Sequence, residues 1–113
     1  MKRKILIVED NVGLSQIQKD WLSQAGYEAV TAMNEPIARS LIRKTQFDLI
    51  LSDVRLPEGD GISLLEWLRK EKKDIPFIIT TEFVSVPDVV RTIKLGARDY
   101  LPKPVHREHL LEL

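Results

Sequence analysis

Carboxylates, a hydroxyl and an ammonium group follow four separate apolar runs of this sequence. They belong to Glu9, Asp10, Asp53, Thr81 and Lys103. Three carboxylates that lie close together repel one another and lose solvation, so they need a cation to balance them. A few oxygen ligands suit Mg²⁺, which keeps several waters, and a lysine can hold a phosphoryl oxygen. Together these groups fit phosphoryl transfer to a carboxylate.

These side chains can meet only if the apolar runs are strands of one sheet. Four of the runs are short and bounded by charged residues or proline, which is typical of strands buried on both faces. A fifth run alternates somewhat and is expected nearer an edge. The four are Ile5–Val8, Leu49–Leu51, Phe77–Ile79 and Tyr100–Leu101, and the fifth is Tyr27–Thr31.

Apolar residues at helical spacing fill the gaps between the strands. We expect a first helix between the N-cap residue Asn11 and Gly26, and a second that begins at Asn34. Three more helices are expected to begin near Ile62, Val86 and His106. The spacing groups Leu14, Ile17, Trp21 and Ala25 in the first helix, and Val86, Val89, Val90 and Ile93 in the fourth.

Strands that alternate with helices predict an α/β fold with a doubly wound, five-stranded parallel sheet and helices on both faces. One domain accounts for all of residues 1–113. In such sheets the functional crevice lies beyond the carboxyl ends of the strands. A single Asp after a strand is typical of a helix cap, and a single Lys is typical of a surface. The placement of all five groups at strand ends favours a functional site.

The chain resembles a response-regulator receiver domain of two-component signalling over residues 4–113. The matching features are the acid pair Glu9-Asp10, Asp53 followed by Pro57 and by Asp60-Gly61, Thr81, Tyr100 and Lys103-Pro104. The intervals from Asp53 to Thr81 and from Thr81 to Lys103 are usual for that family. The resemblance implies the flavodoxin-like strand order 2-1-3-4-5. Residues 99–104 are similar to the receivers of nitrogen-regulator-type transcription activators.

The resemblance also implies a metal site and a phosphoacceptor. Asp53 is expected to become an aspartyl phosphate, so the domain modifies itself and is not classed as an enzyme. Asp10, Asp53 and the backbone carbonyl of Arg55 are expected to bind Mg²⁺ (or Mn²⁺). Glu9 is expected to act through a water on the metal.

Three further residues are implied to read the phosphoryl group. Lys103 pairs with a phosphoryl oxygen, and the Lys103–Pro104 peptide bond is expected to be cis. Thr81 hydrogen-bonds the phosphoryl group, and its movement lets Tyr100 rotate inward.

Two features depart from the family pattern. The residue after the switch threonine is usually small, but here it is Glu82, whose carboxylate repels a phosphoryl group unless it points to solvent. Taking Thr80 as the switch places Thr81 at the small position, but it spoils the spacing to Lys103, so Thr81 is preferred. The second departure is Pro87, in an apolar stretch before the fourth helix.

The implied partners are a sensor histidine kinase or phosphotransfer protein and a downstream output domain. A homodimer through the fourth helix, the fifth strand and the fifth helix is also expected. A pseudo-receiver that binds partners without phosphorylation remains an alternative. A flavin binder of the same sheet order is disfavoured because Glu9-Asp10 would repel its phosphate. A phosphatase of the haloacid dehalogenase type is disfavoured because Arg55 stands where its second Asp belongs.

Charge and composition exclude other classes. Lys and Arg number 17, as do Asp and Glu, so the net charge is zero, which argues against a nucleic-acid binder. No apolar run approaches the roughly 20 residues of a membrane span, and no cysteine is present. We therefore expect a cytoplasmic protein without membrane contact. The last helix, with Leu110, Leu111 and Leu113, is short for a receiver and is expected to be truncated.

Overall fold

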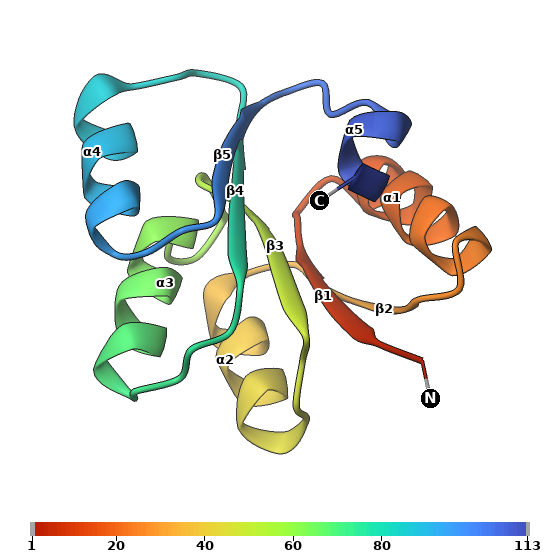
Figure 1. The fold of residues 1–113 in the computed structure, drawn as a ribbon. Helices are drawn as coiled ribbons and strands as arrows, with labels where there is room; N and C mark the ends of the chain where they lie inside the picture. Colours follow the sequence, from red (N-terminus) through yellow and green to blue (C-terminus); the bar gives the residue numbers. More distant parts are fainter. Residues whose placement is uncertain (1, 113) are drawn as a thin grey trace.

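Five parallel strands form one sheet in the order β2-β1-β3-β4-β5, as shown in the computed structural model, which describes residues 2–112 (Figure 1). The strands are β1 (Lys4–Val8), β2 (Glu28–Ala32), β3 (Leu49–Asp53), β4 (Phe77–Thr81) and β5 (Asp99–Pro102). Both the α/β class and the expected strand order are confirmed. The strands β3 and β4 extend further than the apolar runs suggested, so Asp53 and Thr81 are the last residues of their strands.

The helices cover both faces of this sheet. They are α1 (Val12–Gln24), α2 (Glu35–Lys44), α3 (Gly61–Lys70), α4 (Val86–Lys94) and α5 (Arg107–Glu112). Figure 1 shows α1 and α5 on one face and α2, α3 and α4 on the other. The predicted residue Leu113 lies outside the described residues. No helix among residues 2–112 has the length and apolar character needed to cross a bilayer.

Alternate residues of the central strands feed two separate cores. Leu6 and Val8 of β1 pack beneath α2 and α3, whereas Ile5 and Ile7 pack beneath α1 and α5. All four are at most 4% exposed. This alternation explains why the run Ile5–Val8 carries no polar residue, because both faces of the central strand β1 are buried.

Local capping fixes where the helices begin. The side chains of Asn11 and Asn34 accept hydrogen bonds from the backbone N–H groups of Leu14 and Ile37, at 3.0 and 2.9 Å. Pro87 lies in the first turn of α4, where a backbone N–H has no partner within the helix. The proline is therefore a helix-start residue and does not stiffen the loop before it.

The apolar spacing in α1 located the helix but not its buried face. Ser15, Gln18 and Leu22 face the interior, whereas Ile17 is 48% exposed. The rotation of α1 is set by its connection to β1 and its packing against β2 and α5. The buried positions of α1 are therefore offset by one residue from the apolar positions that the spacing grouped.

The apolar face of α4 is also largely in solvent. Val86, Val90 and Ile93 are 73%, 46% and 66% exposed, and the one fully buried residue of the helix is Thr92. The grouped valines therefore do not form the buried contact that their spacing suggested. A helix that buries one threonine is held weakly along its length.

The C-terminal end of α4 is held by Arg69 at the end of α3. Its guanidinium donates hydrogen bonds to the carbonyls of Leu95 and Gly96, at 2.7 and 3.2 Å. It also donates to the carbonyls of Lys73 and Ile75, at 2.9 and 3.3 Å. One side chain thus joins the ends of two helices and the segment that leads into β4.

Candidate functional site

The carboxyl ends of β1, β3, β4 and β5 meet at one edge of the sheet. The register pairs Val8 with Ser52 and Asp53 with Thr80, so the residues that follow β1 lie beside the end of β3. A cavity of about 190 Å³ opens there. Its lining residues are Asp10, Asp53, Arg55, Thr81, Glu82 and Phe83. Four of the sequence-predicted site residues, Asp10, Asp53, Arg55 and Thr81, therefore line one cavity.

Three carboxylates lie together at this cavity. Carboxylate oxygens of Glu9, Asp10 and Asp53 all lie within 4.8 Å of one another. Glu9 is 4% and Asp53 is 8% exposed, whereas Asp10 is in solvent. The backbone N–H of Asn11 donates to Glu9 at 3.1 Å. Such a concentration of negative charge at a buried position requires positive charge beside it.

The ammonium group of Lys103 supplies part of that charge. Its Nζ donates to Oε1 of Glu9 at 2.6 Å and to Oδ2 of Asp53 at 2.8 Å. Its side chain is 9% exposed, so both ion pairs are shielded from water. The backbone N–H of Lys103 donates to the carbonyl of Thr81 at 2.7 Å, and the following Lys103–Pro104 peptide bond is cis.

Burial and these ion pairs shift two pKa values. Burial raises the pKa of the Glu9 carboxyl, although hydrogen bonds from Lys103 and Asn11 act in the opposite direction. Burial alone would lower the pKa of Lys103, but its hydrogen bonds to Asp53 and Glu9 outweigh burial and raise it. Lys103 therefore carries a fixed positive charge at neutral pH, while Glu9 is held at an energetic cost.

The donor set at this edge fits a small divalent cation. Carboxylate oxygens are the hard ligands that Mg²⁺ prefers, and here they come from the ends of β1 and β3. Asp10 is exposed, so the cluster is open to solvent on its side and has room for metal-bound waters. Asp10 and Asp53 present the carboxylates, and Arg55 lines the same cavity. Glu9 is already engaged with Lys103 and Asn11, which suits an indirect role.

The backbone of Asp53 is packed tightly against the start of α3. The Ser52 hydroxyl donates to the Asp53 carbonyl at 2.9 Å. A Cβ on Gly61 would lie 2.9 Å from the Ser52 hydroxyl oxygen and closer still to the Asp53 carbonyl oxygen. Only glycine fits there, which fixes the chain path through Asp53.

The Thr81 hydroxyl is turned toward the loop that follows β4. It donates to the carbonyl of Phe83 at 3.0 Å and accepts from the Phe83 N–H at 3.1 Å. Thr80 is buried inside the strand, and its hydroxyl faces the carbonyl of Ser52 at 3.5 Å. Thr81 lines the cavity and Thr80 does not, which supports the choice of Thr81 as the candidate switch residue.

Tyr100 packs against the core beneath α3 and α4. Its hydroxyl is buried, and it has no hydrogen-bond partner within the part of the chain that the structure describes. A buried hydroxyl without a partner costs about 1–3 kcal/mol. The cost of this hydroxyl offsets part of what the ring gains by packing against the core.

Two features of the cavity mouth were not anticipated in full. Glu82 is exposed, so its carboxylate can point to solvent. The guanidinium of Arg55 lies 5.2 Å from the centre of the Phe83 ring, and this contact joins the loop after β3 to the loop after β4. Phe83 carried no sequence signal, because its contact depends on how the two loops meet.

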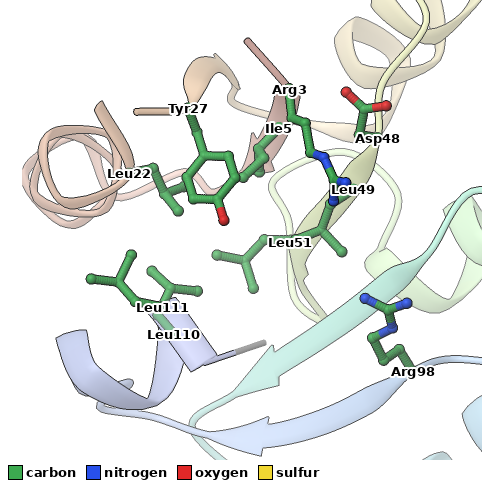
Figure 2. Close-up of a pocket in the computed structure, with 10 residues that line it drawn as sticks. All are labelled: Arg3, Ile5, Leu22, Tyr27, Asp48, Leu49, Leu51, Arg98, Leu110 and Leu111. Carbon is green, nitrogen blue, oxygen red and sulfur yellow. The ribbon is translucent and has the colours of Figure 1, made fainter. Parts of the chain in front are cut away.

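A second cavity, of about 70 Å³, lies beneath α1 and α5, among residues at the amino ends of β1 and β3. Figure 2 shows Leu22, Leu51, Leu110 and Leu111 around the Tyr27 side chain. None of the sequence-predicted site residues lines this cavity. The chemistry therefore belongs to the acidic edge.

A five-stranded parallel sheet with buried acids and a lysine at one edge defines a receiver-type signalling domain. Comparison with known families gives the same answer, since residues 5–113 match the response regulator receiver domain. The chain belongs to this family.

Curated relatives extend the comparison. The chain is 39% identical over 111 residues to the transcriptional regulatory protein ZraR of Salmonella typhimurium, covering 98% of the chain and 25% of ZraR. It is 32% identical over 112 residues to the response regulator protein PilR of Pseudomonas aeruginosa, covering 99% of the chain and 25% of PilR. The chain thus spans about a quarter of these two relatives.

Solved structures agree with the fold. The CheY-like receiver domain protein of Methanospirillum hungatei superimposes with a TM-score of 0.94 at 32% identity, covering 99% of this chain and 90% of that one. The non-phosphorylated HemR receiver domain of Leptospira biflexa gives 0.91 at 38% identity, covering 98% and 90%.

Proposed function

We propose that this domain accepts a phosphoryl group on Asp53 from a sensor histidine kinase or phosphotransfer protein, with Mg²⁺ or Mn²⁺ bound beside it. The observation that carries the proposal is the Asp53 carboxylate itself. It lines an open cavity, lies within 4.8 Å of two other carboxylates, and is 2.8 Å from the Lys103 ammonium. The domain modifies itself, so we do not class it as an enzyme.

The proposed reaction needs no general base. A carboxylate oxygen of Asp53 forms a bond to phosphorus while the bond from phosphorus to the donor histidine nitrogen breaks. The electron pair of that bond stays on the imidazole, which takes up a proton from solvent. Asp10, Asp53 and the Arg55 carbonyl would hold the metal, which would neutralise part of the phosphoryl charge. Lys103 already lies within reach of the Asp53 oxygen and can shift to a phosphoryl oxygen.

The proposed switch starts from the contacts of Thr81. To donate to a phosphoryl oxygen, the Thr81 hydroxyl must give up its hydrogen bond to the Phe83 carbonyl, because it has only one proton to donate. That frees the loop before α4, a helix that buries only Thr92. Tyr100 packs beneath this helix with an unsatisfied hydroxyl, so its environment changes when α4 moves. Reversing a 1:99 equilibrium takes about 5.5 kcal/mol, which a few charge-assisted hydrogen bonds can supply.

The output surface proposed here is α4, β5 and α5. Val86 and Ile93 expose apolar side chains on α4, and a homodimer or an output domain could cover them. The matches to ZraR and PilR support a place among nitrogen-regulator-type transcription regulators. A cytoplasmic location belongs to the same proposal.

Acetyl phosphate and beryllofluoride test the proposal on the full chain. With Mg²⁺, acetyl phosphate should add the mass of one phosphoryl group, and Asp53→Asn should abolish the addition. Beryllofluoride should shift the NMR signals of Thr81 and Tyr100 only when Mg²⁺ is present. A protein that gains no mass and shows no such shifts is instead a pseudo-receiver, the alternative that Glu82 at the cavity leaves open.

A further inference from the structure

We propose that Glu35, at the start of α2, is a positioning residue for the metal-binding edge of the Asp53 site. It holds the loop between β3 and α3, from which Arg55 would present its carbonyl to the metal. This inference rests on the proposed function of the site. Glu35 itself lies outside the acidic cavity and touches none of the reacting groups.

The Glu35 carboxylate is buried and fully engaged with the loop and the start of α3. The residue is 5% exposed. Its Oε1 accepts from the backbone N–H of Asp60 at 3.0 Å, and its Oε2 accepts from the Ser63 hydroxyl at 3.1 Å. Its own backbone N–H donates to the carbonyl of Glu58 at 3.1 Å. One residue of α2 therefore ties down three residues of a segment that follows it by more than 20 positions.

Gly59 brings the loop directly against this carboxylate. A Cβ at Gly59 would lie 2.6 Å from the Cβ of Glu35 and closer still to its Oε1. The φ angle of Gly59 is +79°, in the left-handed region that favours glycine. The loop is thus shaped to close over the Glu35 side chain.

The loop transmits this attachment to the metal-binding edge. Arg55 and Asp60 pair across it as an antiparallel bridge, and the Gly61 N–H donates to the carbonyl of Val54 at 2.8 Å. The Asp60 residue that Glu35 binds is therefore also the residue paired with Arg55. A shift of Asp60 moves Arg55, which lines the Asp53 cavity.

Arg39 and Trp67 keep the Glu35 carboxylate in place. The guanidinium of Arg39, one turn further along α2, forms an ion pair with Oε2 of Glu35. The same guanidinium lies 5.0 Å from the centre of the Trp67 ring on α3. The carboxylate thus has a charge partner on one side and loop donors on the other, so neither oxygen is free to turn away.

An amide cannot make all the contacts of this carboxylate. Each oxygen of Glu35 accepts hydrogen bonds, and an amide has only one oxygen. In Glu35→Gln the NH₂ group must face either the Asp60 N–H or the Ser63 hydroxyl and Arg39. The first arrangement releases the Asp60 N–H, and with it the loop. In the second the Ser63 hydroxyl can turn to accept from the NH₂ group, but the Arg39 guanidinium has no acceptor and loses its charge partner.

The test is the dissociation constant of Mg²⁺, measured by NMR titration of the full chain. Removing a group that orients metal ligands typically weakens metal binding about 10–100-fold, so we expect Glu35→Gln to weaken Mg²⁺ binding about 10-fold. Phosphorylation by acetyl phosphate should slow at low Mg²⁺ and recover at saturating Mg²⁺. Glu66→Gln is the matched control, because Glu66 also pairs with an arginine, Arg91 at 2.8 Å, but does not touch the loop.

The outcomes separate this inference from the proposed function. If Glu35→Gln fails to fold, Ser63→Ala removes a single contact, and it should still weaken Mg²⁺ binding relative to Glu66→Gln. A folded variant that loses thermal stability but binds Mg²⁺ like the wild type shows a merely structural role and overturns the inference alone. A wild-type chain that neither binds Mg²⁺ nor becomes phosphorylated overturns the proposed function and this inference with it.

Discussion

Gly61, the first residue of α3, offers the sharpest test of how the structure positions Asp53. A Cβ added there would lie 2.9 Å from the Ser52 hydroxyl oxygen and 3.1 Å from the Asp53 carbonyl carbon, with the carbonyl oxygen closer still. The two Asp53 atoms belong to the backbone and cannot rotate away. Ordinary contacts to a Cβ are 3.4–4 Å, and the contact with the Asp53 carbonyl oxygen falls short of that by on the order of 1 Å, so Gly61→Ala must push the Asp53 backbone by a similar distance.

The expected magnitudes follow from that displacement. Forcing one extra methyl into a packed position costs about 1–3 kcal/mol. For a domain of this size each kcal/mol lowers the Tm by roughly 4–8 °C. A displacement of about 1 Å at a reacting group costs on the order of 10²-fold in rate. Gly61→Ala should therefore lower both the Tm and the rate of phosphorylation by acetyl phosphate. A 10²-fold loss of rate corresponds to about 2.7 kcal/mol of activation free energy, which is comparable to the loss of stability.

Gly13→Ala is the matched control for this variant. Gly13 also lies in the first turn of a helix, α1, but the nearest atom to its added Cβ is the Asn11 Oδ1 at 3.4 Å, an ordinary contact. This variant should gain about 0.4–1 kcal/mol from reduced entropy of the unfolded chain. Both variants are followed by thermal unfolding and by mass spectrometry of the phosphorylated product. If Gly61→Ala matches Gly13→Ala in both measurements, the reasoning about Asp53 is refuted.

Two further predictions concern charge and the end of α4. Burial raises the pKa of Glu9 in the folded chain. Above that pKa the carboxylate is ionised in both states, and the ionised form is less favourable in the folded chain, so Glu9 lowers the free energy of unfolding there. Glu9→Gln should raise the free energy of unfolding at pH 7 without Mg²⁺. Urea titrations should show this gain shrinking as the pH falls through the raised pKa of Glu9. A gain that stays constant with pH would contradict the prediction. In Arg69→Met the free energy of unfolding in urea should fall by about 2 kcal/mol, because the Arg69 guanidinium donates to four carbonyls. Lys70→Met is the control and should change it little, because the Lys70 side chain is 77% exposed. Equal stability of those two variants would argue against the Arg69 contacts.

Local signals in the sequence were sufficient for the strands and helix starts. The unalternated runs predicted strands buried on both faces, and Ile5 and Leu6 do face opposite cores. Asn11 and Asn34 cap their helices because a capping bond spans only three residues. Such features depend on neighbours in the chain, so the chain alone determines them.

Helix rotation could not be predicted in the same way. Ile17 and Val90 have the spacing of buried residues, yet both are nearly half exposed. Which side of a helix faces the sheet depends on the connecting loops and on neighbouring helices. Spacing counts apolar positions and does not measure those constraints.

For the site, the order of the chain placed Glu9, Asp10, Asp53 and Lys103 at one edge, because parallel strands end on the same side of a sheet. The order of the chain does not show that Lys103 bridges Glu9 and Asp53, or that the Thr81 hydroxyl faces Phe83. These contacts depend on side-chain rotamers and loop paths, to which spacing is blind.

Glu35 marks the limit most clearly. In the sequence it is an ordinary acidic residue in the first turn of a helix, where the helix dipole favours negative charge. In the folded chain its carboxylate meets the backbone of Asp60, 25 residues away, and is buried against Gly59. The strands, the helix caps and the edge where the acids gather follow from the order of residues along the chain. The groups outside that edge that hold it in shape do not, because their contacts form between segments that become neighbours only after folding.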